Sequence, residues 1–301
     1  MAYSGFPLDL IAALRCPNDL GSLVLMGNEK NSHAWQGSLS CMICDTTYQV
    51  QDGIVHLLNG QGKLDTLLEK EIEERDNQAS VYDAHLSERY EKEVSTTLRV
   101  VGDIGNKIVI EYGAGTGRLT ELCAPQSRLY LAIDFSLSSL AVLAKKTVPD
   151  TLGLVLADAI GIRTTPSFFD TALSFQFIEH IPTSGSRRDF YGHVQETLKP
   201  GGSFICSLYH QDLRRIIKRQ DQEGFHSNGI FYHYFFLSEF KSEFKKYFSV
   251  VDVFPIDITL PFEKRFHFSP RMDGILSRIL ERVPLVNRFG HLLIAKGYNG
   301  S

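Results

Sequence analysis

Apolar runs that suit buried strands alternate with amphipathic stretches that suit helices from about residue 106 onward. The strand candidates are rich in β-branched and aliphatic residues, which are typical of strands buried on both faces. They are residues 107–113, 128–135, 153–158, 169–175, 202–209, 249–256 and 291–297. Helical patterns lie between them at 136–146, with Ser136 as a plausible N-cap, and at 187–199 and 237–248. This alternation predicts an α/β fold with a mostly parallel, seven-stranded sheet covered on both faces.

The chain before residue 106 has a different pattern. Residues 8–58 contain short elements broken by turns, a segment too small to bury a core without a metal or docking to the rest. Residues 62–101 carry apolar or small residues every three or four positions among many charges, which indicates an amphipathic helical connector. We therefore expect a small domain at 1–60, a connector at 61–104 and a large domain at 105–301 with an insertion at 257–289.

Composition excludes several classes of protein. The 301 residues are 43% hydrophobic and 22% charged, as in ordinary globular proteins, and the formal net charge of -4 makes nucleic acid an unlikely partner. The sequence has no run of 18 apolar residues and no basic leader followed by an apolar stretch, so cytoplasmic residence is the default expectation. Five cysteines, an odd number, favour reduced thiols over a disulfide framework.

Ligand-binding features stand at the ends of successive predicted strands. The first strand ends in a glycine-rich loop, Gly113-Ala-Gly-Thr-Gly117, where backbone N–H groups and a helix N-terminus can approach a ligand. Such a loop can also be a plain connection between strand and helix. Asp134 ends the second strand, about 20 residues later, where a carboxylate can accept hydrogen bonds from ribose hydroxyls. Asp158 follows the third strand, and ligands of open α/β sheets bind beyond such strand ends.

The ordered motifs resemble those of class I S-adenosylmethionine-dependent methyltransferases, which implies a Rossmann-like fold. The resemblance covers residues 106–209 and the terminal HLLIAKG, through the motifs EYGAGTG, LAIDF, LADAI, FDTALSFQFIEHIP and LKPGGSFICSLYH. A nicotinamide dehydrogenase also uses glycines and an acid, but it usually needs G-x-G-x-x-G, whereas this loop is G-x-G-x-G. A binding module that has kept the fold without activity is a further alternative, which nothing in the intact motifs favours.

The resemblance also implies roles for individual residues. Glu111 and the glycine loop would lie beside the methionine part of the cofactor, Asp134 would bind the ribose, and Asp158 would accept from the adenine amino group. The full expected set is Glu111, Gly113, Ala114, Gly115, Gly117, Asp134, Phe135, Ser136, Asp158, Ala159, Gln176 and Phe177. Phe135 would pack on adenine, Ala159 would offer backbone contacts, and Gln176 and Phe177 would border the sulfonium.

Methyl transfer from a sulfonium needs mainly alignment, with a base only when the acceptor starts protonated. The candidates for that base are His180, His210 and His233. Each could equally be a structural histidine.

Three of the cysteines form a pattern near the N-terminus. Cys41 and Cys44 are two residues apart, and Cys16 and Asp19 repeat that spacing with a carboxylate in the second place. Two such pairs can hold one tetrahedral zinc ion, although Asp is a less common ligand than Cys. The segment is similar to the zinc-ribbon family that includes the activator subunit of tRNA and release-factor methyltransferases. The alternative is a metal-free ribbon whose cysteines fill small buried sites.

The acceptor cannot be identified from sequence, but some classes are favoured. Residues 225–236 are rich in Phe, Tyr and His, which suits an aromatic, polyketide-like, lipid-like or sugar acceptor from a biosynthetic pathway. The alternative is an RNA or protein methyltransferase that recruits its substrate through the ribbon, yet residues 8–58 contain only two basic side chains, Arg15 and Lys30. In the insertion, apolar residues at helical spacing favour a lid over simple packing, with membrane contact not favoured.

Overall fold

All seven predicted strands are present in the computed structural model, which describes residues 3–27, 29–58, 66–82, 90–258, 270–281, 283 and 285–300. They are β8 (Ile108–Tyr112), β9 (Leu129–Asp134), β10 (Leu152–Leu156), β11 (Phe169–Phe175), β12 (Leu198–Tyr209), β15 (Ser249–Ile258) and β16 (Gly290–Tyr298). Their spatial order is β15-β16-β12-β11-β8-β9-β10. The five strands β8 to β12 are parallel to one another, and β16 runs antiparallel to both of its neighbours. The predicted mostly parallel sheet is confirmed.

Helices cover both faces of this sheet. On one face α2 (Tyr90–Val101), α3 (Thr120–Cys123) and α4 (Leu137–Ala144) contribute to one buried apolar cluster. On the other face α5 (Ser184–Thr197) and α7 (Leu237–Phe244) contribute aromatic side chains to a second cluster. Ser136 is the N-cap of α4, as predicted, because its Oγ accepts from the Ser139 amide at 3.0 Å. The helix after the glycine loop is short, and Pro125 follows it in a 3-10 turn.

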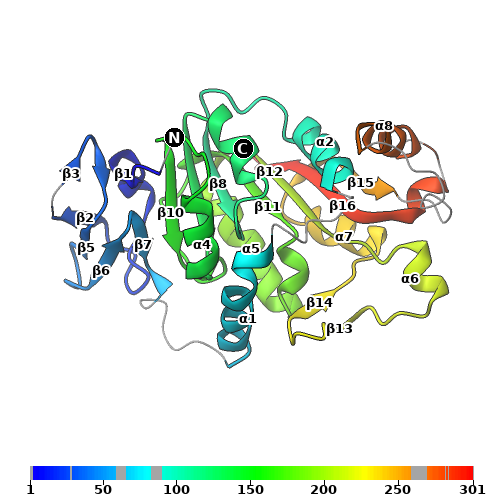
Figure 1. Ribbon diagram of the computed structural model, residues 1–301, viewed down its shortest axis with the longest axis horizontal. Helices are drawn as coiled ribbons and strands as arrows, with labels where there is room; N and C mark the ends of the chain where they lie inside the picture. Colours follow the sequence, from blue (N-terminus) through cyan, green and yellow to red (C-terminus); the bar gives the residue numbers. More distant parts are fainter. Residues whose placement is uncertain are drawn as a thin grey trace.

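The N-terminal segment extends the same sheet. Its elements are β1 (Phe6–Pro7), η1 (Leu8–Ala13), β2 (Leu23–Met26), β3 (Glu29–Lys30), β4 (His33–Ala34), β5 (Gly37–Cys41), β6 (Thr47–Gln51) and β7 (Ile54–His56). Strand β7 pairs in parallel with β10, with Val55 opposite Val155. Among the described residues, the seven strands of the large sheet therefore continue through β7, β6, β5 and β2 into one sheet of eleven strands. Phe6 and Leu10 belong to the same buried cluster as Tyr112 in the central strand. The sheet thus crosses the expected boundary at residue 60, and the segment docks on the rest, as its small size required (Figure 1).

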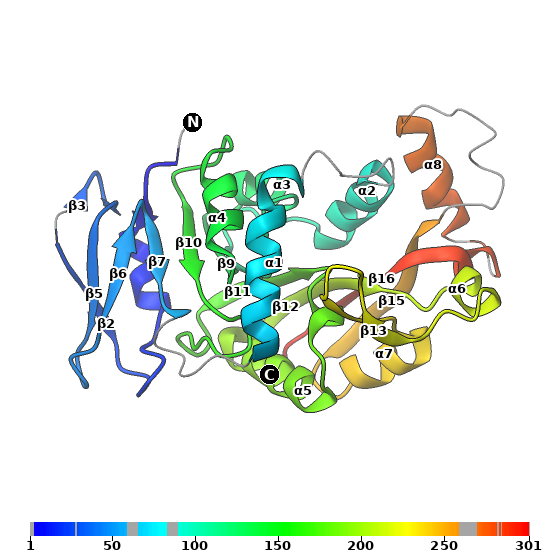
Figure 2. The ribbon, with the colours of Figure 1, turned by 60° about the horizontal axis from the view of Figure 1, so that its bottom comes forward.

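The predicted connector contains α1 (Thr66–Tyr82) and α2, and its residues 83–89 lie outside the described residues. Helix α1 packs against α4 and crosses in front of the sheet (Figure 2). Its Asp76 Oδ1 accepts from the Ser136 hydroxyl at 2.6 Å and from the Ser138 amide at 3.0 Å. An anionic side chain at the N-terminus of α4 also suits the helix dipole. Asp76 therefore anchors α1 to the start of α4.

The remaining elements lie at the end of the molecule opposite the N-terminal strands (Figure 1). They are α6 (Leu213–Ile217), β13 (Glu223–Phe225), β14 (Phe231–His233), α8 (Pro270–Leu280) and η7 (Val286–Phe289). Residues 259–269 of the predicted insertion lie outside the described residues. None of the helices described here combines the length and the apolar character needed to span a membrane.

Candidate functional site

A cleft of about 820 Å³, counting its open mouth, lies where the central parallel strands end. Nine residues predicted from sequence line it: Gly113, Ala114, Gly115, Asp134, Phe135, Ala159, Gln176, Phe177 and His180. They come from the ends of β8, β9, β10 and β11, the edge of the sheet at which the sequence predicted a ligand site.

Asp134 links the glycine loop to the start of α4 at the floor of the cleft. Its Oδ2 accepts from the Gly115 amide at 2.8 Å, and its Oδ1 accepts from the Ser136 amide at 2.9 Å. Burial raises the pKa of this carboxyl, while the two amide hydrogen bonds act against that rise. A carboxylate has about four lone-pair sites, so each oxygen keeps capacity to accept from a ligand hydroxyl.

Two glycines of the loop have different structural roles. Gly115 has a φ of +55°, and a Cβ on it would point into open space, as a residue beside a ligand cleft requires. Gly117 has a φ of +86°, and a Cβ there would lie 2.2 Å from Leu143 of α4. Gly117 therefore permits close packing of α4, and it does not line the cleft.

Glu111 lies beneath the loop, outside the residues that line the cleft. Its Oε2 accepts from the Thr120 hydroxyl at 2.6 Å and from the Tyr130 hydroxyl at 2.8 Å. Burial raises its pKa to about 7, against these two hydrogen bonds. Glu111 is thus a buried carboxyl that changes charge near neutral pH.

Asp158 and Ser136 also lie just outside the cleft lining. The Asp158 Oδ1 accepts from the Ile160 amide at 3.0 Å, and burial raises the pKa of its carboxyl. Ser136 uses its hydroxyl to cap α4 and to bind Asp76. Both residues shape the loops that present Phe135 and Ala159 to the cleft.

A buried charged group lies behind Gln176. The Gln176 Nε2 donates to Glu93 Oε1 at 2.7 Å, and Arg118 forms an ion pair with the same Glu93 carboxylate. Gln176 has a φ of +52°, a left-handed backbone conformation that non-glycine residues rarely adopt. These contacts fix the side-chain amide at the edge of the cleft. The sequence interpretation missed Glu93 and Arg118, although Arg118 directly follows the glycine loop.

Helix α1 supplies one wall of the cleft, which the sequence interpretation also missed. Glu71, Arg75, Gln78, Ala79 and Tyr82 line it. These positions recur at helical spacing, so they lie on one face of α1. The sequence could have indicated this wall, because the residues on this face of α1 are a mixture of charged and small side chains. Such a face is better suited to contact a ligand than to pack in an apolar core. Burial raises the pKa of Glu71, and the adjacent Arg75 opposes the rise.

His180 is the only one of the three candidate bases that lines the cleft as the structure describes it. Its Nδ1 lies 2.7 Å from the Phe231 carbonyl oxygen. Because a carbonyl only accepts, Nδ1 carries the hydrogen and Nε2 keeps the lone pair. Burial, aided by the charge of Arg75, lowers the pKa of His180 to about 3. At neutral pH this side chain is a neutral hydrogen-bond acceptor.

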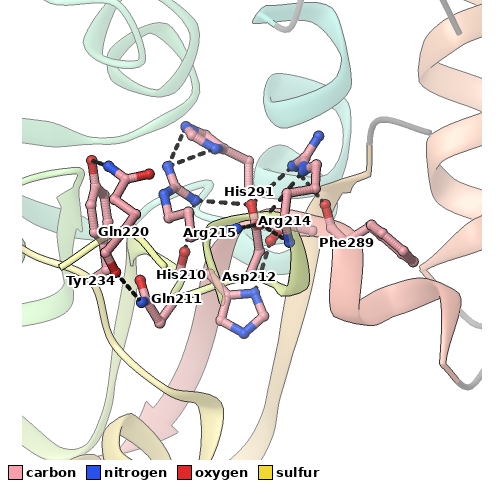
Figure 3. Close-up of polar contacts among 10 residues, drawn as sticks. His210, Gln211, Asp212, Arg214, Arg215, Gln220, Tyr234, Phe289 and His291 are labelled. Carbon is pink, nitrogen blue, oxygen red and sulfur yellow. Dashed lines mark hydrogen bonds and ion pairs between the residues drawn. The ribbon is translucent and has the colours of Figure 1, made fainter. Parts of the chain in front are cut away.

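The other two histidines hold structural contacts away from the cleft lining. His210 Nδ1 is 2.8 Å from the Gly290 carbonyl oxygen, and the His210 carbonyl accepts from Arg215 (Figure 3). His233 bridges Glu223 and Glu239, at 3.2 and 2.9 Å.

Several aromatic rings gather beside His180. Tyr209 lies 6.0 Å from His180 and 5.8 Å from Tyr234 between ring centroids. Tyr232 lies 4.6 Å from both Tyr234 and His226. We call these five residues the aromatic cluster. Arg215 stacks over the Tyr234 ring at 4.1 Å, and its guanidinium also contacts His291 (Figure 3).

The four predicted metal ligands come together at one end of the N-terminal segment. The ligand atoms of Cys16, Asp19, Cys41 and Cys44 all lie within 4.8 Å of one another. The sulfur atoms of Cys16 and Cys44 are 3.7 Å apart, close to the spacing of about 3.8 Å that tetrahedral Zn–S bonds of about 2.3 Å require. Three thiols and a carboxylate are a suitable donor set for zinc, so the residues present fit a structural ion.

Comparisons with known proteins agree with this geometry. A family model described as a methyltransferase domain matches residues 82–251. Chondramide synthase of Chondromyces crocatus is 32% identical over 127 residues, 40% of this chain and 3% of that protein. Malonyl-[acyl-carrier protein] O-methyltransferase of Xylella fastidiosa (strain M23) is 27% identical over 143 residues, 44% of this chain and 46% of that protein. The matches thus span less than half of either curated relative.

The fold is also similar to solved structures. In the DhpI–SAM–HEP complex, the matched chain has a TM-score of 0.56 at 16% identity, with 78% of this chain and 98% of that chain covered. At that identity the likeness concerns the fold.

Proposed function

The chain belongs to the methyltransferase-domain family, and we propose that it transfers the methyl group of S-adenosylmethionine to a small-molecule acceptor in a biosynthetic pathway. The observation that carries this proposal is the cleft at the strand ends, which is lined by the glycine loop, Asp134 and His180, with the rest of the aromatic cluster packed next to His180. Similarity to a malonyl-carrier-protein O-methyltransferase supports a biosynthetic acceptor.

S-adenosylmethionine, once bound, supplies a methyl group already activated on a sulfonium centre, so the protein has mainly to align the reactants. Asp134 would accept from the ribose hydroxyls through the lone pairs that the Gly115 and Ser136 amides leave available. Phe135 and Ala159 would border the adenine. Gln176, whose Nε2 is committed to Glu93, would turn its carbonyl oxygen toward the sulfonium region.

On the acceptor side, His180 would orient the attacking atom. Its Nε2 can accept a hydrogen bond from an acceptor hydroxyl or amine. Because the pKa of His180 is lowered to about 3, its imidazole is a weak proton acceptor, which argues against a role as a general base. The acceptors that fit best therefore attack through an atom that needs no strong base and can still donate a hydrogen bond to Nε2, such as a neutral amine.

The wall formed by α1 supports a small acceptor over a macromolecule. Arg75 and Tyr82 face the cleft from this helix, and Asp76 anchors it to α4. A structured RNA or protein loop would have to displace that helix to reach His180.

The test uses S-adenosylmethionine with a trideuterated methyl group and a cell extract divided into small-molecule and macromolecular fractions. We expect the purified protein to bind the cofactor and to label a compound in the small-molecule fraction, and the Asp134→Ala variant to label far less. Label found only in RNA or protein would overturn the small-acceptor proposal, and absence of cofactor binding in calorimetry would overturn the whole assignment.

A further inference from the structure

Helix α8 holds buried polar residues against the protein and exposes a row of apolar side chains to solvent, while its Leu276 and Leu280 are half-buried. On its inner side Ser277 and Glu281 are buried, and Thr96 of α2 donates to the Glu281 carboxylate at 3.0 Å. On its outer side Met272, Ile275 and Ile279 are 55, 50 and 58% exposed. These three recur at helical spacing, so they form one stripe, which we call the α8 apolar stripe. None of the α8 residues that the structure describes lines the cleft, so this helix is not the lid that the sequence favoured.

Basic side chains border the stripe. A shallow surface hollow is lined by Ile275 and Ile279 together with Arg99 and Arg278. Arg278 is exposed, and Arg99 stays nearly half exposed although it also contacts Glu281. Among the charged side chains described between residues 272 and 289, the acid Glu281 is buried and the bases Arg278 and Arg288 are exposed. The surface around the stripe is therefore apolar and positively charged.

The same end of the molecule carries a second exposed apolar pair. Ile216 and Ile217 of α6 are exposed and are followed by exposed Lys218 and Arg219. Helix α6 is tied to η7 because the Arg214 guanidinium donates to the Phe289 carbonyl at 2.8 Å (Figure 3). Both views place α6 and α8 at the end opposite the N-terminal strands (Figures 1 and 2).

The positive charge of this surface favours an anionic membrane over a second copy of the protein as its partner. A second copy related by two-fold symmetry would bring the same arginines together, and like charges across an interface are unfavourable. A basic, apolar helix face suits the boundary of a membrane with anionic headgroups. Because the whole chain has a net charge of -4, an anionic surface would repel much of the rest of the molecule and orient this end toward itself.

We propose that the α8 apolar stripe, with Arg99 and Arg278 beside it, docks the protein on an anionic lipid surface. The isoleucine side chains enter the headgroup boundary, and the arginines contact lipid phosphates. The contact is peripheral and reversible, since one short apolar stripe is small. This inference does not depend on the methyl acceptor.

The test is sedimentation of the full-length protein with vesicles of phosphatidylcholine alone or mixed in equal parts with phosphatidylglycerol. We expect binding to the mixed vesicles, at least tenfold weaker binding to neutral ones, and weakening by salt. The double variant Ile275→Glu/Ile279→Glu should bind mixed vesicles at least tenfold more weakly. Arg278→Glu should weaken binding about fivefold or more, the scale of one basic residue at such a surface.

Val251→Glu is the matched control, because Val251 is also exposed and lies in β15, seven residues before the end that contacts α8. It should bind as the unmodified protein does, and all variants should keep their melting temperature and cofactor affinity. Absence of binding to mixed vesicles, or equal binding by the Ile275→Glu/Ile279→Glu variant, would overturn the proposal. A dimer in gel filtration that this variant dissociates, without vesicle binding, would assign the stripe to a second copy instead.

Discussion

The buried carboxyl of Glu111 makes the stability of this protein depend on pH in a way that one substitution should remove. Glu111 is almost fully buried below the glycine loop, and burial raises its pKa from 4.5 to about 7. The hydroxyls of Thr120 and Tyr130 both donate to its Oε2. Glu111→Gln keeps the size of the side chain and its carbonyl acceptor, but it cannot ionise.

The direction of this pH dependence follows from which state, folded or unfolded, loses the Glu111 proton at the lower pH. In the unfolded chain Glu111 releases its proton near pH 4.5, whereas in the folded protein it keeps the proton until about pH 7. The folded state therefore binds more protons in this range, and the free energy of unfolding falls as pH rises. The difference of about 2.5 pH units corresponds to about 3 kcal/mol, fully present below pH 4.5 and lost above pH 7.

The assay is urea unfolding of the unmodified protein and of Glu111→Gln at several pH values between 4.5 and 8. The variant should gain about 3 kcal/mol relative to the unmodified protein between the two ends of this range, because other groups cancel in the comparison. Glu196→Gln, at an exposed position on α5, is the control and should show no such gain. A constant difference between Glu111→Gln and the unmodified protein at all pH values would refute the reasoning.

Three further predictions concern the cleft and the cysteines. Asp134→Ala should weaken cofactor binding in calorimetry by about 1.5 to 3 kcal/mol, the scale for hydrogen bonds to a charged group, and a lower melting temperature with unchanged affinity would mean a purely structural role. His180→Gln should lower kcat/KM for the acceptor about tenfold or more with cofactor affinity unchanged, whereas a change confined to cofactor affinity would contradict its place on the acceptor side. Elemental analysis should find close to one zinc per chain, and Cys41→Ser should open the segment before residue 60 to protease; a zinc-free protein that resists protease would show that packing alone holds the ribbon.

Local rules were enough to predict the floor of the cleft. A glycine loop after β8, an acid at the end of β9 and the turns after β10 and β11 must meet, because parallel neighbouring strands end at one edge of a sheet. The same rules could not rank the histidines. His180, His210 and His233 look alike in sequence, and the carbonyl that fixes each of the first two comes from a distant segment, 51 residues away for His180 and 80 for His210.

The sequence by itself determined the alternation of strands and helices, and it predicted a site at the strand ends and a group of four candidate metal ligands, because each depends on periodicity, turn chemistry or ligand spacing. Only the tertiary structure decided that β7 joins the edge of β10, that α1 forms a wall of the cleft and that α8 faces solvent with its isoleucines. An amphipathic pattern predicts that a helix has two faces, but which face is buried depends on the partner. The Thr96 hydroxyl donates a hydrogen bond to the Glu281 carboxylate on the inner side of α8. This long-range contact favours the orientation in which the apolar side of the helix faces solvent.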